Sequence, residues 1–241
     1  MTKRRIGILG GMGPEATVLL MSRIIAMTDA SDDCDHVPMI VENNTQVPSR
    51  IKAILEKTGE DPGPVLADMA RRLEANGAEA LAMPCNTAHY YAPVIEAAVS
   101  IPLLNMVKIT ADRVAGMSLA KSRVGLLASP AVRSTVVYDQ VFSGLGIETI
   151  YSREQDRMLE AIRMVKINSR DTAARRIMKA TAQELIDDGA DVLLVACSEL
   201  SIIADAIPDS VISLDAIDVL GEQIVKFAGA KLRRGDGERA R

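Results

Sequence analysis

Short apolar runs alternate along this chain with longer segments in which apolar residues recur every three to four positions. Runs such as residues 6–9 and 192–195 have the length and continuous hydrophobicity of strands that are buried on both faces. Segments such as residues 65–76 and 172–188 carry an apolar stripe at helical spacing. The alternation of strand and helix predicts an α/β fold with mainly parallel sheets.

The remaining elements follow from the same two patterns. Further strands are expected near residues 37–41, 78–83, 101–105, 123–127, 148–151 and 211–215. Further helices are expected near residues 14–30, 87–99, 107–117, 136–142 and 216–232, with one more around Lys166.

The second half of this pattern repeats the first. Residues 5–9 (RIGIL) are matched by residues 123–127 (RVGLL), an offset of 118 residues. We therefore expect two similar α/β domains, each with a mainly parallel four-stranded sheet flanked by helices, whose strand ends face one another. Residues 1–105 with 216–241 are expected to form the first domain and residues 106–215 the second. A structureless tail is expected from residue 233 onward.

Two cysteines occupy equivalent places in the repeat. Cys85 follows Gly77 by eight residues, Cys197 follows Gly189 by eight residues, and each cysteine comes at the end of an apolar run. Open α/β sheets hold ligands at the carboxyl ends of their strands, so both thiols are expected at such a site. A helix is expected to begin at each cysteine, and the positive end of its dipole would lower the pKa of the thiol.

Two thiols on opposite sides of a small molecule can invert a stereocentre. One thiol acts as a thiolate and removes a proton, while the other donates a proton to the opposite face. Asn86, Thr87 and Ser198 can orient these thiols or hold substrate oxygens. Glu199 can assist proton movement at Cys197.

Other candidate residues have simpler explanations. His89 lies four residues after Cys85 and fits a neutral structural histidine as well as a residue that supports the cysteine. Cys34 lies in a polar loop without a matching motif and is expected to play a packing role only. Asp215 is expected to cap the final helix.

Two loops of the first half can hold an anion. The glycine turn at residues 10–16 offers free backbone N–H groups to a carboxylate or phosphate. Its spacing also matches a relaxed dinucleotide fingerprint, although Glu42 only loosely supplies the acidic residue that this motif requires. The polar loop at residues 43–50 ends in Arg50, whose guanidinium can bind a carboxylate or face solvent.

Composition argues against several classes of function. The chain has 241 residues, of which 48% are hydrophobic and 25% charged, as in an ordinary globular protein. The formal net charge of −4 and the lack of a basic cluster argue against nucleic-acid binding, and no apolar run reaches the ~20 residues of a membrane span. Three cysteines without a CxxC pair argue against a disulfide framework or a zinc site and favour a reducing cytoplasm.

Four motifs together resemble the cofactor-independent aspartate/glutamate racemase superfamily, most closely its aspartate racemase branch. They are GGMGP at residues 10–14, NNTQVPSR at 43–50, MPCNTAH at 83–89 and ACSE at 196–199. The motifs lie in both halves, so the resemblance covers the whole domain pair. It implies two pseudo-symmetric domains with the active site in the cleft between them, no pyridoxal phosphate and a homodimer.

The resemblance also implies roles for individual residues. By position, Cys85 and Cys197 become the two acid/base residues, and Arg50 and Lys166 become the partners of substrate carboxylates. Without the resemblance, Lys166 fits a solvated charge on a helix. The implied pocket-lining residues are Met12, Asn86, Thr87 and Ser198.

We therefore expect a PLP-independent racemase that inverts the α-carbon of aspartate or a similar acidic amino acid. Alternatives are an isomerase of another small acid or amino acid, a noncatalytic amino-acid-binding protein, and a dinucleotide-dependent oxidoreductase. Ala196-Cys197-Ser198 stands where the family commonly has Gly-Cys-Thr, a departure that keeps the thiol and hydroxyl but can alter substrate preference. Glu199, where glutamate racemases have histidine, favours the aspartate branch.

Overall fold

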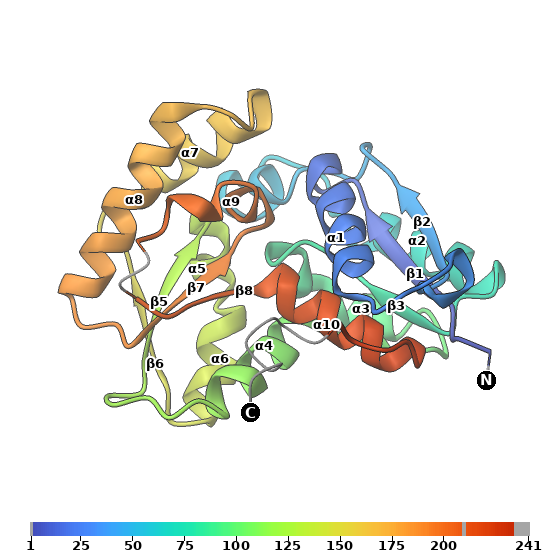
Figure 1. Cartoon of the computed structure of the whole chain (residues 1–241). Coiled ribbons are helices and arrows are strands. Elements are labelled where there is room, and N and C mark those ends of the chain that lie inside the picture. The colour runs from blue at the N-terminus through green and yellow to red at the C-terminus, as the bar shows by residue number, and fades with distance from the viewer. Residues whose placement is uncertain (1, 209–210, 234–241) are drawn as a thin grey trace, which may run out of the picture.

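Two parallel four-stranded sheets lie side by side, as Figure 1 shows for the computed structural model, which describes residues 2–208 and 211–233. The strand order is β2-β1-β3-β4 in the first sheet and β6-β5-β7-β8 in the second. All strand pairs within each sheet are parallel. The expected pair of similar α/β units, each with a four-stranded sheet flanked by helices, is confirmed.

The elements have the following bounds. The strands are β1 (Ile6–Gly10), β2 (Met39–Asn43), β3 (Ala80–Ala82), β4 (Leu103–Leu104), β5 (Arg123–Ala128), β6 (Glu148–Tyr151), β7 (Val192–Ala196) and β8 (Ser213–Asp215). The α-helices are α1 (Pro14–Met27), α2 (Gly63–Ala75), α3 (Ala92–Glu96), α4 (Met106–Ala115), α5 (Pro130–Thr135), α6 (Val137–Gly144), α7 (Gln155–Ile167), α8 (Thr172–Asp187), α9 (Ser198–Ser201) and α10 (Ala216–Ala228). Shorter helical turns are η1 (Asp33–Asp35), η2 (Lys52–Glu56), η3 (Thr87–Tyr91) and η4 (Ala204–Ala206).

The repeat in the sequence corresponds to a repeat in the packing. A Cβ atom on Gly7 of β1 would lie 2.9 Å from Cβ of Ala78, and one on Gly125 of β5 would lie 3.0 Å from Cβ of Ala190. The first distance is shorter than real Cβ contacts and the second is at their lower limit, and the Cβ on Gly125 would also lie 2.8 Å from Cδ2 of Leu193. Each central strand therefore favours glycine beside the turn that leads from α2 into β3 or from α8 into β7. The RIGIL and RVGLL motifs therefore encode the same close approach of helix and strand.

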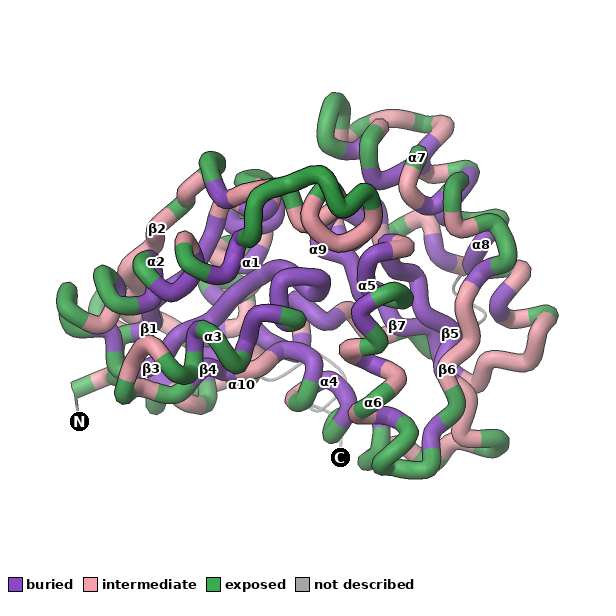
Figure 2. The backbone as a smooth tube through the Cα atoms, turned by 180° about the vertical axis from the view of Figure 1, so that it is seen from behind, coloured by how far each residue is buried: buried purple, intermediate pink, exposed green. Residues whose placement is uncertain are grey.

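Each sheet is covered on both faces, and one core connects the two halves. The central strands are buried, while the helices expose their outer faces (Figure 2). One apolar cluster runs from α1 through α4 and α10 to β5 and β7. Separate clusters fill the opposite face of the first sheet under α2 and the opposite face of the second sheet under α7 and α8.

The final helix, α10, packs against the first half. Arg23 of α1 pairs with Asp218 of α10 at 3.2 Å, and the N–H of Arg4 donates to the carbonyl of Ala228. Asp215 accepts the N–H of Ile217 and caps α10, as predicted. The expected division into residues 1–105 with 216–241 and 106–215 stays a prediction, and the expected tail lies outside the described residues from 234 onward. Among the described helices, none combines the length and apolarity of a membrane span.

The prediction of one continuous helix over residues 87–99 is wrong. Residues Thr87–Tyr91 make a 3₁₀ turn instead, and the α-helix that follows contains only Ala92–Glu96. Pro93 lacks the N–H that would donate to the carbonyl of His89 in a continuous α-helix, so the α-helical pattern cannot run through this point. The N–H of Ala92 bonds to that carbonyl instead, with the tighter 3₁₀ spacing.

Candidate active site

Both cysteines of the repeat line one small cavity between the two halves. Cys85 follows β3 and Cys197 follows β7, so each thiol lies beyond the carboxyl end of a central strand, as predicted. The cavity has a volume of about 50 Å³. Its lining residues are Met12, Ser49, Arg50, Ile51, Cys85, Thr87, Ser129, Ile162, Lys166, Cys197 and Glu199.

A larger cavity of about 380 Å³ adjoins the first. The two cavities share Ser49, Arg50, Lys166 and Glu199, so these side chains separate the cysteines from the wider space. The glycine turn after β1 lies along the larger cavity, which places its backbone at the mouth of the site. The wider cavity is therefore the approach to the thiols.

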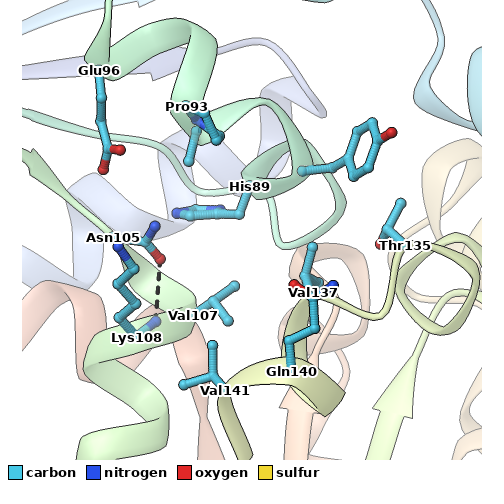
Figure 3. A pocket seen from close by; sticks show the side chains of 12 residues that line it. His89, Pro93, Glu96, Asn105, Val107, Lys108, Thr135, Val137, Gln140 and Val141 are labelled. Carbon is cyan, nitrogen blue, oxygen red and sulfur yellow. Dashed lines mark hydrogen bonds between the residues drawn. The ribbon is translucent and has the colours of Figure 1, made fainter.

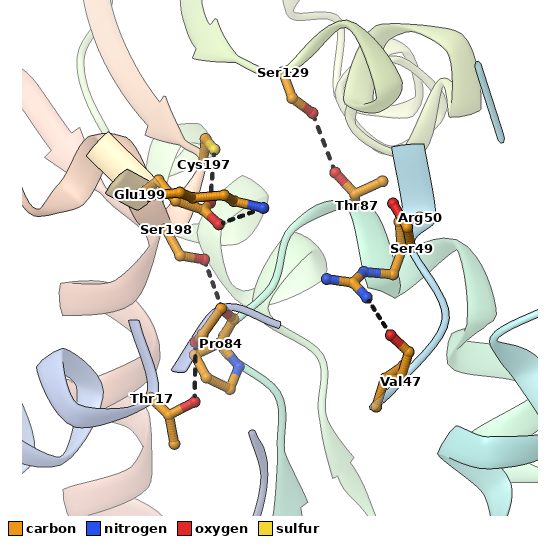
Figure 4. A network of polar contacts seen from close by, with 12 residues as sticks. Thr17, Val47, Ser49, Arg50, Pro84, Thr87, Ser129, Cys197, Ser198 and Glu199 are labelled. Carbon is orange, nitrogen blue, oxygen red and sulfur yellow. Dashed lines mark hydrogen bonds and ion pairs between the residues drawn. The ribbon is translucent and has the colours of Figure 1, made fainter. Parts of the chain in front are cut away.

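A chain of polar contacts connects Cys197 to this approach. Sγ of Cys197 lies 3.2 Å from Oε2 of Glu199, and Oε1 of Glu199 lies 3.2 Å from Nζ of Lys166 (Figure 4). Glu199 is only 8% exposed, so its charge needs a partner, and Lys166 supplies one. Lys166 therefore lines the cavity and pairs with Glu199, while its side chain stays 47% exposed, so it is also a partly solvated charge on α7.

The predicted lowering of the thiol pKa values is also wrong. Burial raises the pKa of Cys85, with the Arg50 charge opposing that shift, and burial together with the Glu199 carboxylate raises the pKa of Cys197 well above its ordinary value. The helical segments that follow the cysteines are the 3₁₀ turn at Thr87–Tyr91 and the four-residue α9. Such short segments align few peptide dipoles, so desolvation outweighs them.

The loop that carries Cys85 is held by side chains of the second half. Ser198 donates its hydroxyl hydrogen bond to the carbonyl of Pro84 at 2.6 Å, and Thr87 bonds to Ser129 at 3.2 Å (Figure 4). Asn86 accepts a hydrogen bond from Tyr138. Asn86 and Ser198, both predicted to line the pocket, are thus buried beside it and connect the halves instead.

His89 forms hydrogen bonds that hold the backbone of Cys85. Its Nδ1–H donates to the carbonyl of Cys85 at 2.8 Å, and its Nε2 accepts the N–H of Met106 at 3.0 Å. Burial lowers the pKa of His89 to about 4, so the ring stays neutral at physiological pH. The ring also lines a separate cavity of about 280 Å³ between α3, α4 and α6 (Figure 3), and neither cysteine is among the residues that line it.

Arg50 is the second cation of the site. Its guanidinium donates to the carbonyls of Val47 and Pro48, which fixes the side chain at the cavity wall. Within the part of the chain that the structure describes, no carboxylate pairs with Arg50. Its charge is therefore available to an anionic ligand, in contrast to that of Lys166.

Several lining residues escaped the sequence analysis. Ser129 precedes Pro130 as Gly13 precedes Pro14, so the internal repeat contained a signal for it. Ile162 stands one helical turn before Lys166, and helical spacing places both on one face of α7. Ser49 lies in the NNTQVPSR motif but was not singled out, and Ile51, which follows the motif, had no distinguishing pattern.

Comparison with known proteins gives consistent results. The family Asp/Glu/Hydantoin racemase matches this chain over residues 9–224. The broad specificity amino-acid racemase RacX of Bacillus subtilis (strain 168) is 29% identical over 225 residues, which are 91% of this chain and 96% of that protein. The solved structure of Picrophilus torridus aspartate racemase is 30% identical, with a TM-score of 0.82 over 95% of this chain and 96% of that one.

A more distant structure shares the fold. Glutamate racemase from Francisella tularensis, solved with D-glutamate, is 17% identical with a TM-score of 0.66, covering 94% of this chain and 81% of that one. The family match extends over both sheets and includes both cysteines. The chain therefore belongs to the Asp/Glu/Hydantoin racemase family, and its enzyme class is isomerase, as a racemase.

Proposed function

We propose that this enzyme racemises an amino acid by moving the α-proton between Cys85 and Cys197, with aspartate or a similar acidic amino acid as substrate. The observation that carries the proposal is that both thiols line one cavity whose wall also holds Arg50 and Lys166. The reaction needs only protein side chains: a thiolate to take the proton, a thiol to return one, and cations to hold carboxylate groups.

The surroundings of the thiols assign their starting roles. Arg50 and Lys166 both favour the thiolate of Cys85, whereas the Glu199 carboxylate, which lies beside Cys197, strongly disfavours a second negative charge there. Cys85 is therefore the base for one enantiomer, and Cys197 is the acid that protonates the opposite face.

One turnover moves the α-proton onto Cys85 and a different proton from Cys197 onto the α-carbon. The Cys85 thiolate takes the α-proton and becomes a thiol, and the electron pair left on the α-carbon spreads onto the carboxylate beside Arg50. The Cys197 thiol then gives its proton to the opposite face of the α-carbon and becomes a thiolate. To restore the starting state, the Cys85 thiol releases its proton to solvent and the Cys197 thiolate regains one. Glu199 contacts both Cys197 and the wider cavity, so it offers a route for the solvent proton back to Cys197.

Substrate binding requires this site to open. The cavity of about 50 Å³ is much smaller than the ~150 Å³ that holds benzene in a protein core, so an amino acid does not fit in the present arrangement. The cavity wall comes from both halves, and separating them would widen it. Closure afterwards would exclude water from the carbanion and bring the thiols to working distance.

A wider range of amino acids is the second candidate. Met12, Ile51 and Ile162 make part of the cavity wall apolar, and Lys166 is already paired with Glu199. Lys166 would therefore stabilise a second substrate carboxylate less than an unpaired cation would. The broad specificity of the relative RacX supports this alternative.

Proton NMR in D₂O tests the reaction and the substrate together. Reduced, folded protein is incubated without added cofactor with each enantiomer of aspartate, glutamate, alanine and serine, and loss of the α-proton signal is followed alongside chiral analysis. We expect exchange with inversion for aspartate. Inversion of alanine and serine at comparable rates supports the broader range, and no exchange with any substrate contradicts the racemase proposal.

Three variants test the assigned roles in the same assay. Cys85→Ser and Cys197→Ser are each expected to slow racemisation by at least ~10²-fold, because a hydroxyl is a far weaker acid than a thiol. Lys166→Met is expected to slow the reaction of aspartate more than that of alanine. Full activity in either cysteine variant would contradict the two-base mechanism.

A further inference from the structure

We propose that Tyr138 is a positioning residue for Cys85, acting through Asn86. Tyr138 lies in α6 of the second half, 52 positions from Asn86 in the sequence, and neither the repeat nor any motif singled it out. This inference deepens the proposed two-cysteine reaction and rests on it. It assigns to a residue outside the cavity the task of fixing the loop that presents one of the two thiols.

The contact between Tyr138 and Asn86 is short and buried. The phenol oxygen of Tyr138 lies 2.6 Å from Oδ1 of Asn86, and the two residues are 0% and 2% exposed. A separation of 2.6 Å is typical of O–H···O and short for N–H···O, so the amide oxygen faces the tyrosine and accepts its hydroxyl proton. Burial raises the pKa of Tyr138 far above its ordinary value, so the phenol remains a donor throughout the working pH range.

Tyr138 is itself rigidly held. Its ring stacks on Phe142 with 5.7 Å between ring centroids and 22° between ring planes, and Phe142 is also fully buried. Both rings belong to the apolar cluster that includes β5 and β7. The hydroxyl therefore projects from a fixed part of the second half, which is what a positioning contact requires.

Asn86 depends on this single contact. Among the described residues, Nδ2 of Asn86 has no hydrogen-bond partner, so the phenol provides the hydrogen bond that orients the amide. A buried amide without any partner is unfavourable, and loss of the Tyr138 hydroxyl would leave both ends of it unpaired. The loop would then settle in another arrangement.

Hydrogen bonds from both halves of the protein hold the Cys85–Asn86 segment in place. His89 of the first half donates to the Cys85 carbonyl, while Tyr138 of the second half donates to the Asn86 side chain. Releasing one side moves the backbone that carries the Cys85 thiol, and a displacement of about 1 Å at a reacting group can reduce the rate by ~10²-fold. Cys197 follows a different strand, β7, and is not released by this change.

Tyr138→Phe tests the inference, with Tyr151→Phe as the matched control. Tyr151 lies in the same half, and its hydroxyl donates a hydrogen bond of 2.7 Å to Asp139 rather than to the Cys85 loop. The first measurement is the rate of iodoacetamide alkylation of Cys85 and of Cys197, resolved by peptide mass spectrometry from pH 6.5 to 10. Alkylation needs no turnover, so it reports on thiol position and ionisation even if the racemase proposal fails.

We expect Tyr138→Phe to change the Cys85 alkylation rate at least threefold while leaving that of Cys197 within twofold of wild type. Its kcat for racemisation should fall about 10- to 100-fold with a smaller change in KM, and Tyr151→Phe should alter none of these values. Equal changes at both cysteines, or equal effects of the two tyrosine variants, would overturn the inference.

A double-mutant cycle with Asn86→Ala tests the route. If Tyr138 acts through Asn86, the single Asn86→Ala variant also changes Cys85 alkylation selectively, and adding Tyr138→Phe to it has little further effect. Independent, additive effects would show that Tyr138 does not act through Asn86. The Asn86→Ala variant also serves as the primary test if Tyr138→Phe does not fold.

Discussion

Sγ of Cys197 lies 3.2 Å from Oε2 of Glu199, whereas no described side chain forms a hydrogen bond with Sγ of Cys85. The two thiols hold equivalent places in a repeated fold, so this difference breaks the symmetry at the point where chemistry is proposed to occur. At Cys85, burial and the Glu199 charge raise the pKa, and the charges of Arg50 and Lys166 oppose that rise. At Cys197, burial raises the pKa, and the charge and the hydrogen bond of Glu199 add to that effect. The two thiols therefore differ in acidity before any substrate binds.

Glu199→Gln is expected to make Cys197 more acidic. The Glu199 carboxylate raises the pKa of Cys197 both by its charge and by its hydrogen bond, and a neutral amide at this position removes the charge while its oxygen accepts only a weaker hydrogen bond. Alkylation of Cys197 at pH 7.5 should become about tenfold faster or more, which corresponds to a shift of about one pKa unit. Racemisation should nevertheless slow by about 10²-fold, because Glu199 no longer carries protons.

Glu15→Gln is the control for this variant. Glu15 lines the wider cavity and contacts neither thiol in the described hydrogen bonds. The Glu15→Gln variant should leave the alkylation rate of Cys197 within twofold of wild type. An unchanged Cys197 rate in Glu199→Gln would show that the carboxylate does not control this thiol.

The pH dependence of racemisation should follow from the raised thiol pKa values. Burial raises the pKa of both cysteines, so at neutral pH the free enzyme holds mostly two thiols and little of the form with one thiolate. The value of kcat/KM should therefore rise with pH, up to tenfold per unit, until the pair first ionises, and fall again above its second ionisation. Kinetics from pH 6 to 10 test this, and a maximum below pH 7 would contradict it.

Asp215 should make folding stability depend on pH. Burial, followed by the nearby charge of Asp218, raises the pKa of Asp215 from 3.8 to about 7, which means that the folded state holds this proton more tightly than the unfolded chain. Its contribution is complete below about pH 4 and is lost as the pH rises to about 7. The full loss between about pH 4 and pH 7 should be on the order of 4 kcal/mol in the free energy of unfolding.

Asp215→Asn keeps a capping side chain on α10 and removes the titration. Urea unfolding at pH 5 and pH 8 should show a smaller difference for this variant than for wild type. Asp171→Asn, at the amino end of α8, is the matched control because Asp171 caps its helix in the same way. If wild type and Asp215→Asn have the same pH dependence, burial of Asp215 is not the cause.

Gly125→Ala should destabilise the second half. The added Cβ would lie 2.8 Å from Cδ2 of Leu193 and 3.0 Å from Cβ of Ala190 and of Leu185, all of them in the core beside β5. We expect the free energy of unfolding to fall by about 1–3 kcal/mol. Gly144→Ala is the control, because its Cβ would meet nothing within 4 Å in α6 and should be neutral or stabilise by up to ~1 kcal/mol.

The sequence predicted much of the fold because its local patterns agree with its tertiary contacts. The short apolar run over β7 is typical of a buried strand, and the amphipathic stripe of α8 is typical of a helix buried on one face. The match between RIGIL and RVGLL revealed the repeat, because the same close packing of helix on strand requires the same glycine in both halves. Where Pro93 interrupts the helical pattern, the predicted helix was too long.

The candidate site was predictable only in part. The repeat identified Cys85 and Cys197, and the family motifs indicated Arg50 and Lys166, all of which line the cavity. Asn86 and Ser198 were expected at its wall, but their side chains form hydrogen bonds to residues of the other half instead. Ser129 and Ile162 reach the cavity from other elements.

By itself, therefore, the sequence determined the two α/β halves, the position of each cysteine beyond a central strand and the membership of a racemase family. Only the tertiary structure determined the direction of the pKa shifts of those cysteines and the hydrogen bonds that hold the loop of Cys85. Burial of Cys197 against Glu199 reverses the pKa shift expected from a helix terminus, and the Tyr138–Asn86 contact joins residues 52 positions apart. Desolvation and long-range hydrogen bonds exist only once the halves are packed together, so no local pattern of residues encodes them.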